Sequence, residues 1–502
     1  MIRDGKTSGW LTLPPQAVQP WAEINGVDFK QTMPGTAVGR GGALLAKEDI
    51  TAPTSDSEAL PVLLTVPKEL ILSAERIREH SNIDQDFRQV LEAIGAFAST
   101  SVYGGNTPRG AILVFLLVQA SVSCPHLKER VSVHTPFTDY IKSLPMERLP
   151  TFWTETELSL LVGTTLAPAV TSKLRSLQRE YDTLYDDLLT TRWYRLVSRH
   201  FTFDDWKQVD AMYRSRALDF PDIGHCMVPV VDLANHSAGE TTIAVYEKDS
   251  QGNAMLQLRE RKSLRKGDEV TITYGDEKGA CEMLFSYGFL EHGRTSAETL
   301  FLSLAIQDDD VYRSAKMRMA DCAPGFKIID TGDGEIDWTG DFIWLLCVGH
   351  DDGLRFELAR VVNSEDEETH AFFNDQELSG GAQQLRQLLA QHELWDVFHL
   401  RAVALLQQRV LDQSSTLQGT QEVVEGLPHG DGTDISDRVF EQAMQLRKLE
   451  RDLLETACED FERQKVQLAQ SPVVQRYLAQ MAGEGMRNEG SQHLRNGEEE
   501  FS

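Results

Sequence analysis

The stretch of sequence that most constrains how this chain can fold lies at residues 227–290. It opens with an apolar, β-prone run that ends on three polar residues, Asn235, His236 and Ser237. Burying such side chains without hydrogen-bond partners is costly. Either the surrounding fold satisfies these groups, or they are held ready for a ligand.

The period of the apolar residues divides the chain into blocks. We interpret residues 1–20 as a loosely ordered lead-in. Short β-prone runs follow, helical spacing dominates from about 84 to 210, and short strands return from 228 to 274. A helical block between two strand-rich blocks predicts a small strand domain that is discontinuous in sequence.

The second half of the chain has a different pattern. From residue 306 to about 480 the apolar spacing predicts helices, with Gly, Ser, Thr and Asp at 412–437 indicating a loop or partly disordered connection. Residues 481–502 are polar and are expected to form a mobile, acidic tail. The predicted fold class is α+β: a β-rich domain with an inserted helical subdomain, followed by an all-α C-terminal domain.

The charge of the chain bears on its partners. The formal net charge is -28, whereas a nucleic-acid-binding surface is a basic patch, so we expect no direct nucleic-acid partner. A field of this sign would attract a lysine-rich protein, although solubility is the simpler explanation of the charge alone.

Other features of the sequence bear on the compartment. The longest apolar run, at 111–118, falls short of the roughly 18 residues that a membrane span requires, so we expect a buried helix and no membrane partner. The N-terminus lacks the apolar core of a signal peptide. The six cysteines have no paired spacing and are expected to be reduced thiols, not a disulfide frame or a zinc site. A cytosolic or nuclear protein is the default expectation.

Several short motifs occur in the order seen in SET-domain methyltransferases. They are Gly39-Arg40-Gly41, Ser215-Arg216, Asp232 to Ser237, Gly267 to Val270, Tyr274-Gly275 and Tyr287-Gly288-Phe289. Their arrangement resembles the branch typified by the Rubisco large-subunit lysine methyltransferase. In that branch a helical insert interrupts the SET domain, and a helical substrate-binding domain follows. The resemblance implies a SET domain at 21–305, with its insert at about 84–210, and a substrate-binding domain at 306–480.

The resemblance also implies a cofactor, S-adenosylmethionine, and the residues that hold it. Closely spaced glycines leave the backbone open to a ligand, although alone they indicate no more than a hairpin turn. A permanent planar cation at Arg216 suits the cofactor carboxylate and the substrate, while a salt bridge within the fold is the alternative. The cofactor-binding residues carried over are Gly39, Arg40, Gly41, Arg216, Asn235, His236 and Phe289.

For catalysis the resemblance points first to Tyr287. Transfer of a methyl group to an amine requires a neutral amine aimed along the S-methyl axis, and a free lysine has a pKa of roughly 10.4. A tyrosine hydroxyl can orient that amine, although without the resemblance Tyr287 would be a core tyrosine. Tyr274 is a second active-site aromatic or a packing residue. The substrate-binding residues carried over are Arg216, Asp232, Tyr246 and Tyr287.

The sequence departs from the family in two places. Where the family usually carries an asparagine, this chain has Gly279 or Ala280, which puts one supporting hydrogen bond in doubt. The cysteine-rich zinc segment of many histone-directed SET domains is also missing, which fits the non-histone branch, and we expect no metal.

Three functions follow as hypotheses. The first is a protein-lysine N-methyltransferase that acts on a non-histone protein, with basic ribosomal or translation-related proteins as the expected substrates and a monomer as the expected state. The second is a protein-histidine N-methyltransferase. The third is a non-catalytic SET-like scaffold that binds a partner, which the joint presence of Asn235, His236 and Tyr287 disfavours.

Overall fold

The computed structural model describes residues 13, 17–53, 59–95, 107–146, 148–332, 334–360 and 367–481. Contacts divide the chain into two compact units. The first takes the described parts of Met1–Trp153, Pro168–Lys278 and Glu282–Phe289, and the second those of Thr154–Ala167, Gly279–Cys281 and Leu290–Ser502. The lead-in at 1–12 and 14–16 and the tail at 482–502 lie outside the described residues.

The first unit is built around a four-stranded sheet in the order β1-β2-β11-β7. Its strands are β1 (Thr32–Ala37), β2 (Gly41–Ala46), β11 (Glu269–Ile272) and β7 (Asn235–His236). β1 and β2 form an antiparallel hairpin, and β2 continues antiparallel onto β11, with Leu45 opposite Glu269. β7 pairs with β11 in parallel, which places Asn235 opposite Thr271. Strands that are about 200 residues apart in the sequence therefore pair in one sheet.

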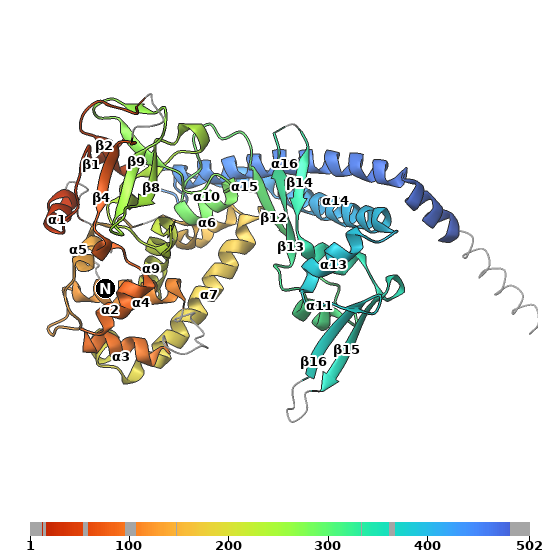
Figure 1. The fold of residues 1–502 in the computed structure, drawn as a ribbon, viewed down its shortest axis with the longest axis horizontal. Helices are drawn as coiled ribbons and strands as arrows, with labels where there is room; N and C mark the ends of the chain where they lie inside the picture. The colour runs from red at the N-terminus through yellow and green to blue at the C-terminus, as the bar shows by residue number, and fades with distance from the viewer. Residues whose placement is uncertain are drawn as a thin grey trace, which may run out of the picture. The chain divides into compact units, whose positions relative to one another are not determined.

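Smaller sheets and two helices surround the four-stranded sheet of the first unit (Figure 1). A three-stranded sheet has the order β4-β9-β8, and two strand pairs join β10 to β3 and β5 to β6. Their apolar side chains form one core with those of β2 and β11. The elements are α1 (Val18–Ile24), β3 (Ile50–Thr51), β4 (Val62–Val66), β5 (Leu218–Phe220), β6 (Gly224–Cys226), β8 (Ala244–Lys248), β9 (Ala254–Leu258), β10 (Ser263–Leu264) and α10 (Ala280–Tyr287).

Between β4 and β5 the chain forms helices, as the apolar spacing predicted. They are α2 (Ala74–Ser81), α3 (Gln85–Ala93), α4 (Pro108–Val122), α5 (Pro136–Ser143), α6 (Glu155–Ser159), α7 (Leu166–Asp187), α8 (Arg192–Val197) and α9 (Phe203–Arg216). α6 and the first two residues of α7 fall in the second unit. None of the helices in the described ranges has both the length and the apolar character needed to cross a membrane.

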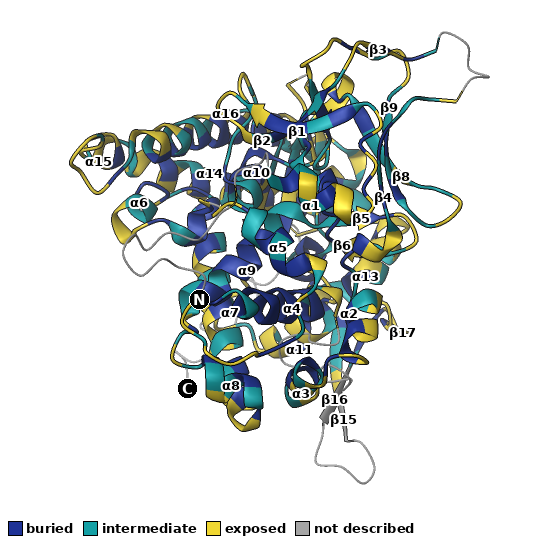
Figure 2. Cartoon of the chain, turned by 90° about the vertical axis from the view of Figure 1, so that its left-hand side faces the viewer, coloured by how far each residue is buried: buried dark blue, intermediate teal, exposed yellow. Residues whose placement is uncertain are grey.

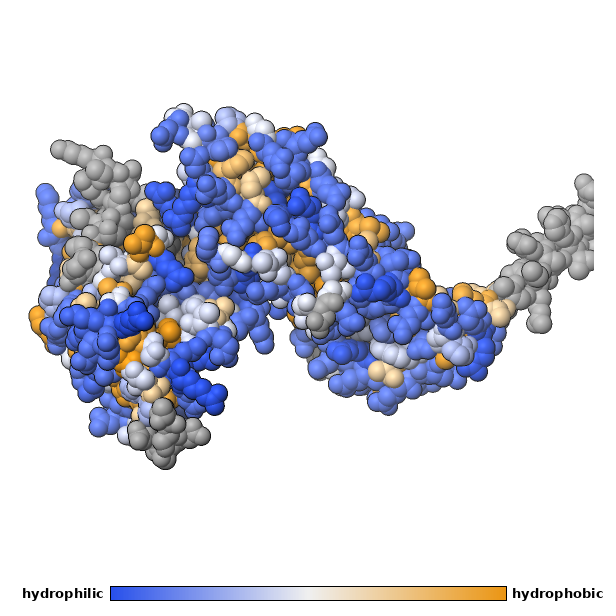
Figure 3. Space-filling model, turned by 90° about the horizontal axis from the view of Figure 1, so that it is seen from above, coloured by the Kyte–Doolittle hydropathy of each residue, from blue (hydrophilic) through white to orange (hydrophobic). Residues whose placement is uncertain are grey.

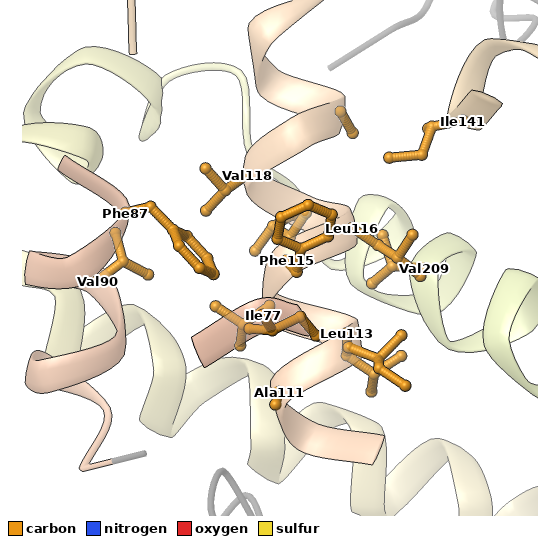
Figure 4. Packing of buried hydrophobic residues seen from close by; sticks show 14 of the residues in the cluster. Ile77, Phe87, Val90, Ala111, Leu113, Phe115, Leu116, Val118, Ile141 and Val209 are labelled. Carbon is orange, nitrogen blue, oxygen red and sulfur yellow. The ribbon is translucent and has the colours of Figure 1, made fainter. Parts of the chain in front are cut away.

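The central helix of this block is α4, which is almost entirely dark blue in Figure 2. It starts where the Thr107 side chain accepts a hydrogen bond from the Gly110 amide and Pro108 occupies the first turn, a combination typical of helix starts. Phe115 contacts Phe87 edge to face at 5.5 Å in the cluster of Figure 4. The apolar run at 111–118 is thus the buried helix that the sequence predicted.

The second unit combines helices with two three-stranded sheets, in the orders β12-β13-β14 and β15-β16-β17. The strands are β12 (Thr299–Ser303), β13 (Gly325–Asp330), β14 (Ile336–Thr339), β15 (Leu354–Arg360), β16 (Glu367–Phe373) and β17 (Gln376–Glu377). The helices are α11 (Arg313–Met319), α12 (Trp344–Cys347), α13 (Gly381–Ala390), α14 (Trp395–Gly419), α15 (Gln421–Glu425) and α16 (Asp437–Ala469). The α+β fold class with a helical C-terminal region is confirmed.

Two details of the second unit differ from the sequence-based expectation. The C-terminal domain is not all-α as expected. Short alternating runs such as Phe326, Lys327 and Ile328 form strands in which the first and third residues are buried and the second is exposed. The expected loop at 412–437 is helical as far as residue 425. Gln413 and Leu417 are buried at helical spacing and hold this part of α14 in the core against its polar composition.

The surface and the cysteines agree with the composition. The face of the molecule in Figure 3 is mostly hydrophilic, with scattered apolar residues. The six cysteines all lie in described ranges, and none of them forms a disulfide.

Candidate functional site

The turn between β1 and β2 presents backbone to solvent. Gly39 and Gly41 have φ angles of +75° and +80°, a region that favours glycine, and a side chain at either position would meet nothing within 4 Å. Val38 at the tip is fully exposed. The two glycines are therefore needed for the backbone path, and the surface above them is open to a ligand.

Asn235 fixes β7 to both neighbouring strands. Its Nδ2 atom donates to the Gly42 carbonyl at 3.1 Å and to Glu269 Oε1 at 2.6 Å. Arg40 reaches the same carboxylate, with its guanidinium 3.3 Å from Glu269 Oε2 and 3.3 Å from the His236 carbonyl. Glu269 thus joins the glycine turn to the Asn-His strand. Glu269 lies in the motif Gly267 to Val270, and the sequence analysis assigned it no role. A charged residue within an apolar strand was the signal that could have identified it.

His236 is almost fully buried, with 4% of its surface exposed. Its Nδ1 accepts a hydrogen bond from the Tyr274 amide at 3.0 Å, so that nitrogen carries no proton. Its ring lies 5.2 Å from the Tyr274 ring and 6.3 Å from that of Phe289. The side chain therefore ties β7 to the end of β11 and to the segment after α10.

Three aromatic rings follow one another beside His236. The Tyr274 and Tyr287 rings are 4.6 Å apart with 35° between their planes, and Tyr287 lies 6.4 Å from Phe289. The Tyr274 hydroxyl donates to the Ala234 carbonyl at 3.0 Å. That hydroxyl donates to the backbone and keeps its capacity to accept, so both the packing role and the catalytic role of Tyr274 stay predictions.

The Tyr287 hydroxyl contacts an amine of the protein itself. Lys278 Nζ donates to it at 2.6 Å and lies 4.9 Å from the centre of the Tyr287 ring. The hydroxyl in turn lies 3.4 Å from the Tyr274 carbonyl. Gly275, with a φ of +129°, leaves room for the Lys278 chain, because a side chain there would come within 3.1 Å of it. The sequence analysis missed Lys278, and no local pattern pointed to it.

Arg216, at the C-terminal end of α9, holds the segment that precedes β7. Its guanidinium donates to the Asp232 carbonyl at 2.9 Å and lies 3.3 Å from Asp232 Oδ2, which also accepts from the Tyr140 hydroxyl at 2.6 Å. Burial raises the pKa of the Asp232 carboxyl, and the charge of Arg216 opposes that rise. Burial and the charge of Asp232 raise the pKa of Tyr140 well above its usual value. The salt bridge within the fold is thus present, and substrate contacts by Arg216 and Asp232 stay predictions.

The backbone before β7 adopts an uncommon conformation. Val230 is buried and has a φ of +74°, which is rare for a β-branched residue and costs about 1–3 kcal/mol. The surrounding core holds it there, and the 3-10 turn Val231–Leu233 that follows sends Asp232 toward Arg216.

Tyr246 lies on β8 with its ring stacked on Phe220, at 5.8 Å and 19°. Burial raises its pKa, and Asp219, Cys226 and Tyr287 add to the rise. The substrate-binding role of Tyr246 stays a prediction.

The backbone is closely packed at Gly279 and Ala280, where the sequence departs from the family that it resembles. A side chain at Gly279 would come within 2.4 Å of the Thr299 carbonyl and 2.8 Å of the Ala297 carbonyl. The Ala280 amide donates to the same Ala297 carbonyl at 3.0 Å. The chain therefore packs backbone where the family usually carries an asparagine side chain.

Comparisons with known proteins agree with these features. No family model matches the chain. It is 28% identical over 304 residues to the SET domain-containing protein 8 of Schizosaccharomyces pombe, covering 59% of this chain and 64% of that protein. It is 28% identical over 290 residues to the N-lysine methyltransferase setd6 of Xenopus laevis, covering 54% and 56%. It is 26% identical over 315 residues to the chloroplastic Rubisco large subunit N-methyltransferase of Pisum sativum, covering 61% and 57%.

The matches thus span between about half and two thirds of the length of these relatives. Among solved structures, the SET domain of LSMT bound to lysine and AdoHcy superposes with a TM-score of 0.61 at 20% identity, over 92% of this chain and 94% of that one. A structure of Rubisco LSMT bound to AdoMet gives a TM-score of 0.59 at 19% identity, over 92% and 94%. These results confirm the resemblance that the sequence motifs indicated.

Proposed function

We propose that this chain is an S-adenosylmethionine-dependent protein-lysine N-methyltransferase. It has the fold of the Rubisco LSMT structures, and SET-domain methyltransferases are among its relatives. One observation carries the proposal. The Tyr287 hydroxyl, in a row of aromatic rings, already receives a lysine amine at 2.6 Å. The Tyr287 hydroxyl can therefore accept a hydrogen bond from a lysine amine, as an acceptor lysine requires.

The residues around β7 fit the cofactor. S-adenosylmethionine carries a carboxylate, an ammonium and a sulfonium, and this region supplies the guanidinium of Arg40 and the carboxylate of Glu269. The open backbone at Gly39 and Gly41 permits close approach, and Asn235 and His236 lie on the adjacent strand. When bound, the cofactor supplies an electrophilic methyl group.

On the acceptor side, Tyr287 would position the substrate amine. Its hydroxyl donates toward the Tyr274 carbonyl and can accept a hydrogen bond from an N–H of the amine, which leaves the single lone pair of a neutral amine pointing away from the hydroxyl. Removal of water from the amine beside Tyr274 and Phe289, together with the positive charge of the bound cofactor, would favour loss of the proton of a substrate ammonium. Tyr287 needs no nucleophilic role in this arrangement.

The substrate class is part of the proposal. A net charge of -28 favours a basic protein partner, and we propose a non-histone protein, with ribosomal or translation-related proteins as first candidates. A monomer in the cytosol or nucleus is the corresponding expectation. The contact between Lys278 and Tyr287 supports an aliphatic amine over an imidazole as acceptor.

Radiolabelled methyl transfer tests the function. Purified full-length chain and labelled S-adenosylmethionine are added to a cell extract that lacks this protein, and the labelled protein is identified by mass spectrometry. Methyl-lysine in a non-histone protein is the expected product. Methyl-histidine would establish the alternative acceptor. No transfer, together with no cofactor binding by calorimetry, would reject both enzyme functions and leave the scaffold hypothesis.

A further inference from the structure

A small cavity in the second unit is lined by aromatic rings from separate segments of the chain. Its volume is about 310 Å³, which is at the lower end of ligand pockets and suits a single side chain. Trp338 comes from β14, Trp344 from α12, and Trp395 and His399 from the first turns of α14. None of these residues belongs to the candidate methyl-transfer site.

Each of the four rings lies next to two of the others. Trp338 lies 5.9 Å from Trp344, and Trp344 lies 5.0 Å from Trp395. Trp395 lies 5.4 Å from His399, which is 6.3 Å from Trp338. The planes of successive rings are turned by 27° to 45°, and Trp395 is stacked on His399.

Burial separates one ring from the other three. Trp344 is 2% exposed and belongs to the core, whereas Trp338, Trp395 and His399 are only half-buried. Large aromatic side chains kept partly in water are typical of surfaces that bind something. Core packing explains Trp344 and leaves the exposure of the other three rings unexplained.

The charges around the cavity favour a cation. Asp337 is exposed at its edge, and Asp341 pairs with Arg386 at 3.3 Å. Burial lowers the pKa of His399, which keeps its imidazole uncharged near neutral pH. The lining therefore carries two carboxylates against one guanidinium, and the indole faces add negative potential.

We infer that this cavity binds the trimethylammonium end of a trimethyllysine side chain in another protein. Methylation keeps the positive charge of lysine and removes its N–H donors, so the group can lie against aromatic rings without leaving a donor unpaired, while the carboxylates of the lining oppose its charge. The inference assigns a second ligand site beyond the proposed catalytic function. It does not depend on methyl transfer by this chain.

Binding to peptides tests the inference. Full-length chain is titrated with one basic peptide in four forms: trimethyllysine, unmodified lysine, the uncharged carbon isostere of trimethyllysine, and arginine. We expect the trimethyllysine form to bind about tenfold or more tightly than the others, as removal of a desolvated cation–π contact predicts. Equal binding of the uncharged isostere or of unmodified lysine would overturn the inference.

Substitutions locate the site. Trp338→Leu and Trp395→Leu should each abolish the preference for the trimethyllysine peptide, whereas Trp395→Phe should retain part of it. Asp337→Asn, an exposed change with little effect on folding, should weaken binding several-fold. Trp21→Leu in the first unit is the matched control, and thermal unfolding checks each variant. A preference that survives both tryptophan changes in folded protein would place the binding elsewhere.

Two further measurements separate sources and functions. Free choline carries the same trimethylammonium group, and binding of choline without binding of the peptide would contradict a protein ligand. S-adenosylmethionine affinity is measured on the same samples. If the unmodified protein does not bind S-adenosylmethionine, the proposed function is rejected and the peptide result still stands. If it binds S-adenosylmethionine and shows no preference for the trimethyllysine peptide, the inference is rejected and the proposed function still stands.

Discussion

The amine of Lys278 lies 2.6 Å from the hydroxyl of Tyr287, with the Glu282 carboxylate 3.9 Å from the same amine. An acceptor lysine that is to use this hydroxyl must first displace Lys278. The chain thus carries an internal competitor for the position in which the proposed function places its substrate.

Replacement of this competitor should change substrate affinity. Lys278→Met keeps an unbranched chain over Gly275 and removes the charge. We expect the KM for the protein substrate to fall about fivefold, which corresponds to a contact of about 1 kcal/mol, with kcat little changed. Steady-state kinetics measure both, with the exposed Lys266→Met as control. A fall in kcat at constant KM would show instead that Lys278 positions Tyr287.

The hydroxyl of Tyr287 can be removed without its ring. Tyr287→Phe keeps the stacking on Tyr274 and should slow methyl transfer by about 10²–10³-fold while leaving cofactor affinity intact, because the hydroxyl acts on the acceptor. Single-turnover transfer and calorimetry report the two quantities. Tyr181→Phe, which loses a hydroxyl in the helical block, is the control. Full activity of Tyr287→Phe would exclude it from the mechanism.

A single atom change at Asn235 should disturb the proposed cofactor site. Asn235→Asp places a carboxylate against the Glu269 carboxylate and the Gly42 carbonyl, both of which now accept hydrogen bonds from the amide. We expect S-adenosylmethionine affinity to fall by about tenfold or more, a loss within the cost of unpaired buried polar groups. Asn82→Asp, on the surface, should bind normally. Unchanged affinity in Asn235→Asp would move the cofactor away from β7.

Glu450 predicts a pH dependence of stability in the second unit. Its carboxylate is fully buried and accepts from the Thr165 amide at 2.8 Å and the Thr165 hydroxyl at 2.6 Å. Burial raises the pKa of Glu450 from 4.5 to about 7, with the Thr165 hydrogen bonds opposing the rise. Between those values the folded chain holds a proton that the unfolded chain has released. The free energy of unfolding therefore falls as pH rises, by about 1.4 kcal/mol per pH unit from this group.

Glu450→Gln removes the titration. Urea unfolding at pH 5, 6, 7 and 8 should show the variant gaining stability relative to the parent protein as pH rises, with the gain levelling off above the raised pKa. Glu455→Gln, an exposed change on the same helix, should give a constant difference. A constant difference for Glu450→Gln as well would contradict the raised pKa.

Much of the first unit could be predicted from its sequence because its signals are local. The run at 111–118 is apolar on every face, which predicts a buried element, and the motifs around Asn235 and Tyr287 lie in short segments of fixed order. The strand Ile336–Thr339 of the second unit was missed since four residues are too few to show a period of two.

The parts of the site that escaped prediction depend on contacts between distant residues. The hydrogen bond from Asn235 to Glu269 exists only because β7 pairs in parallel with β11. The pairing partner of a two-residue strand cannot be predicted from its sequence. Trp338 and Trp395 are 57 residues apart in the sequence, and only the fold brings them to one cavity. The role of Lys278 depends on where a flexible side chain lies.

The pairing of Leu45 with Glu269 has a consequence for synthesis of the chain. β2 leaves the ribosome long before β11, and the helical block emerges between them with a core of its own. Its local contacts form early, whereas closing so long a loop is slow. Nascent chains stalled before residue 269 should therefore show a protease-resistant helical block and a protease-sensitive β1–β2 hairpin, whose unpaired edge is the segment most in need of a chaperone.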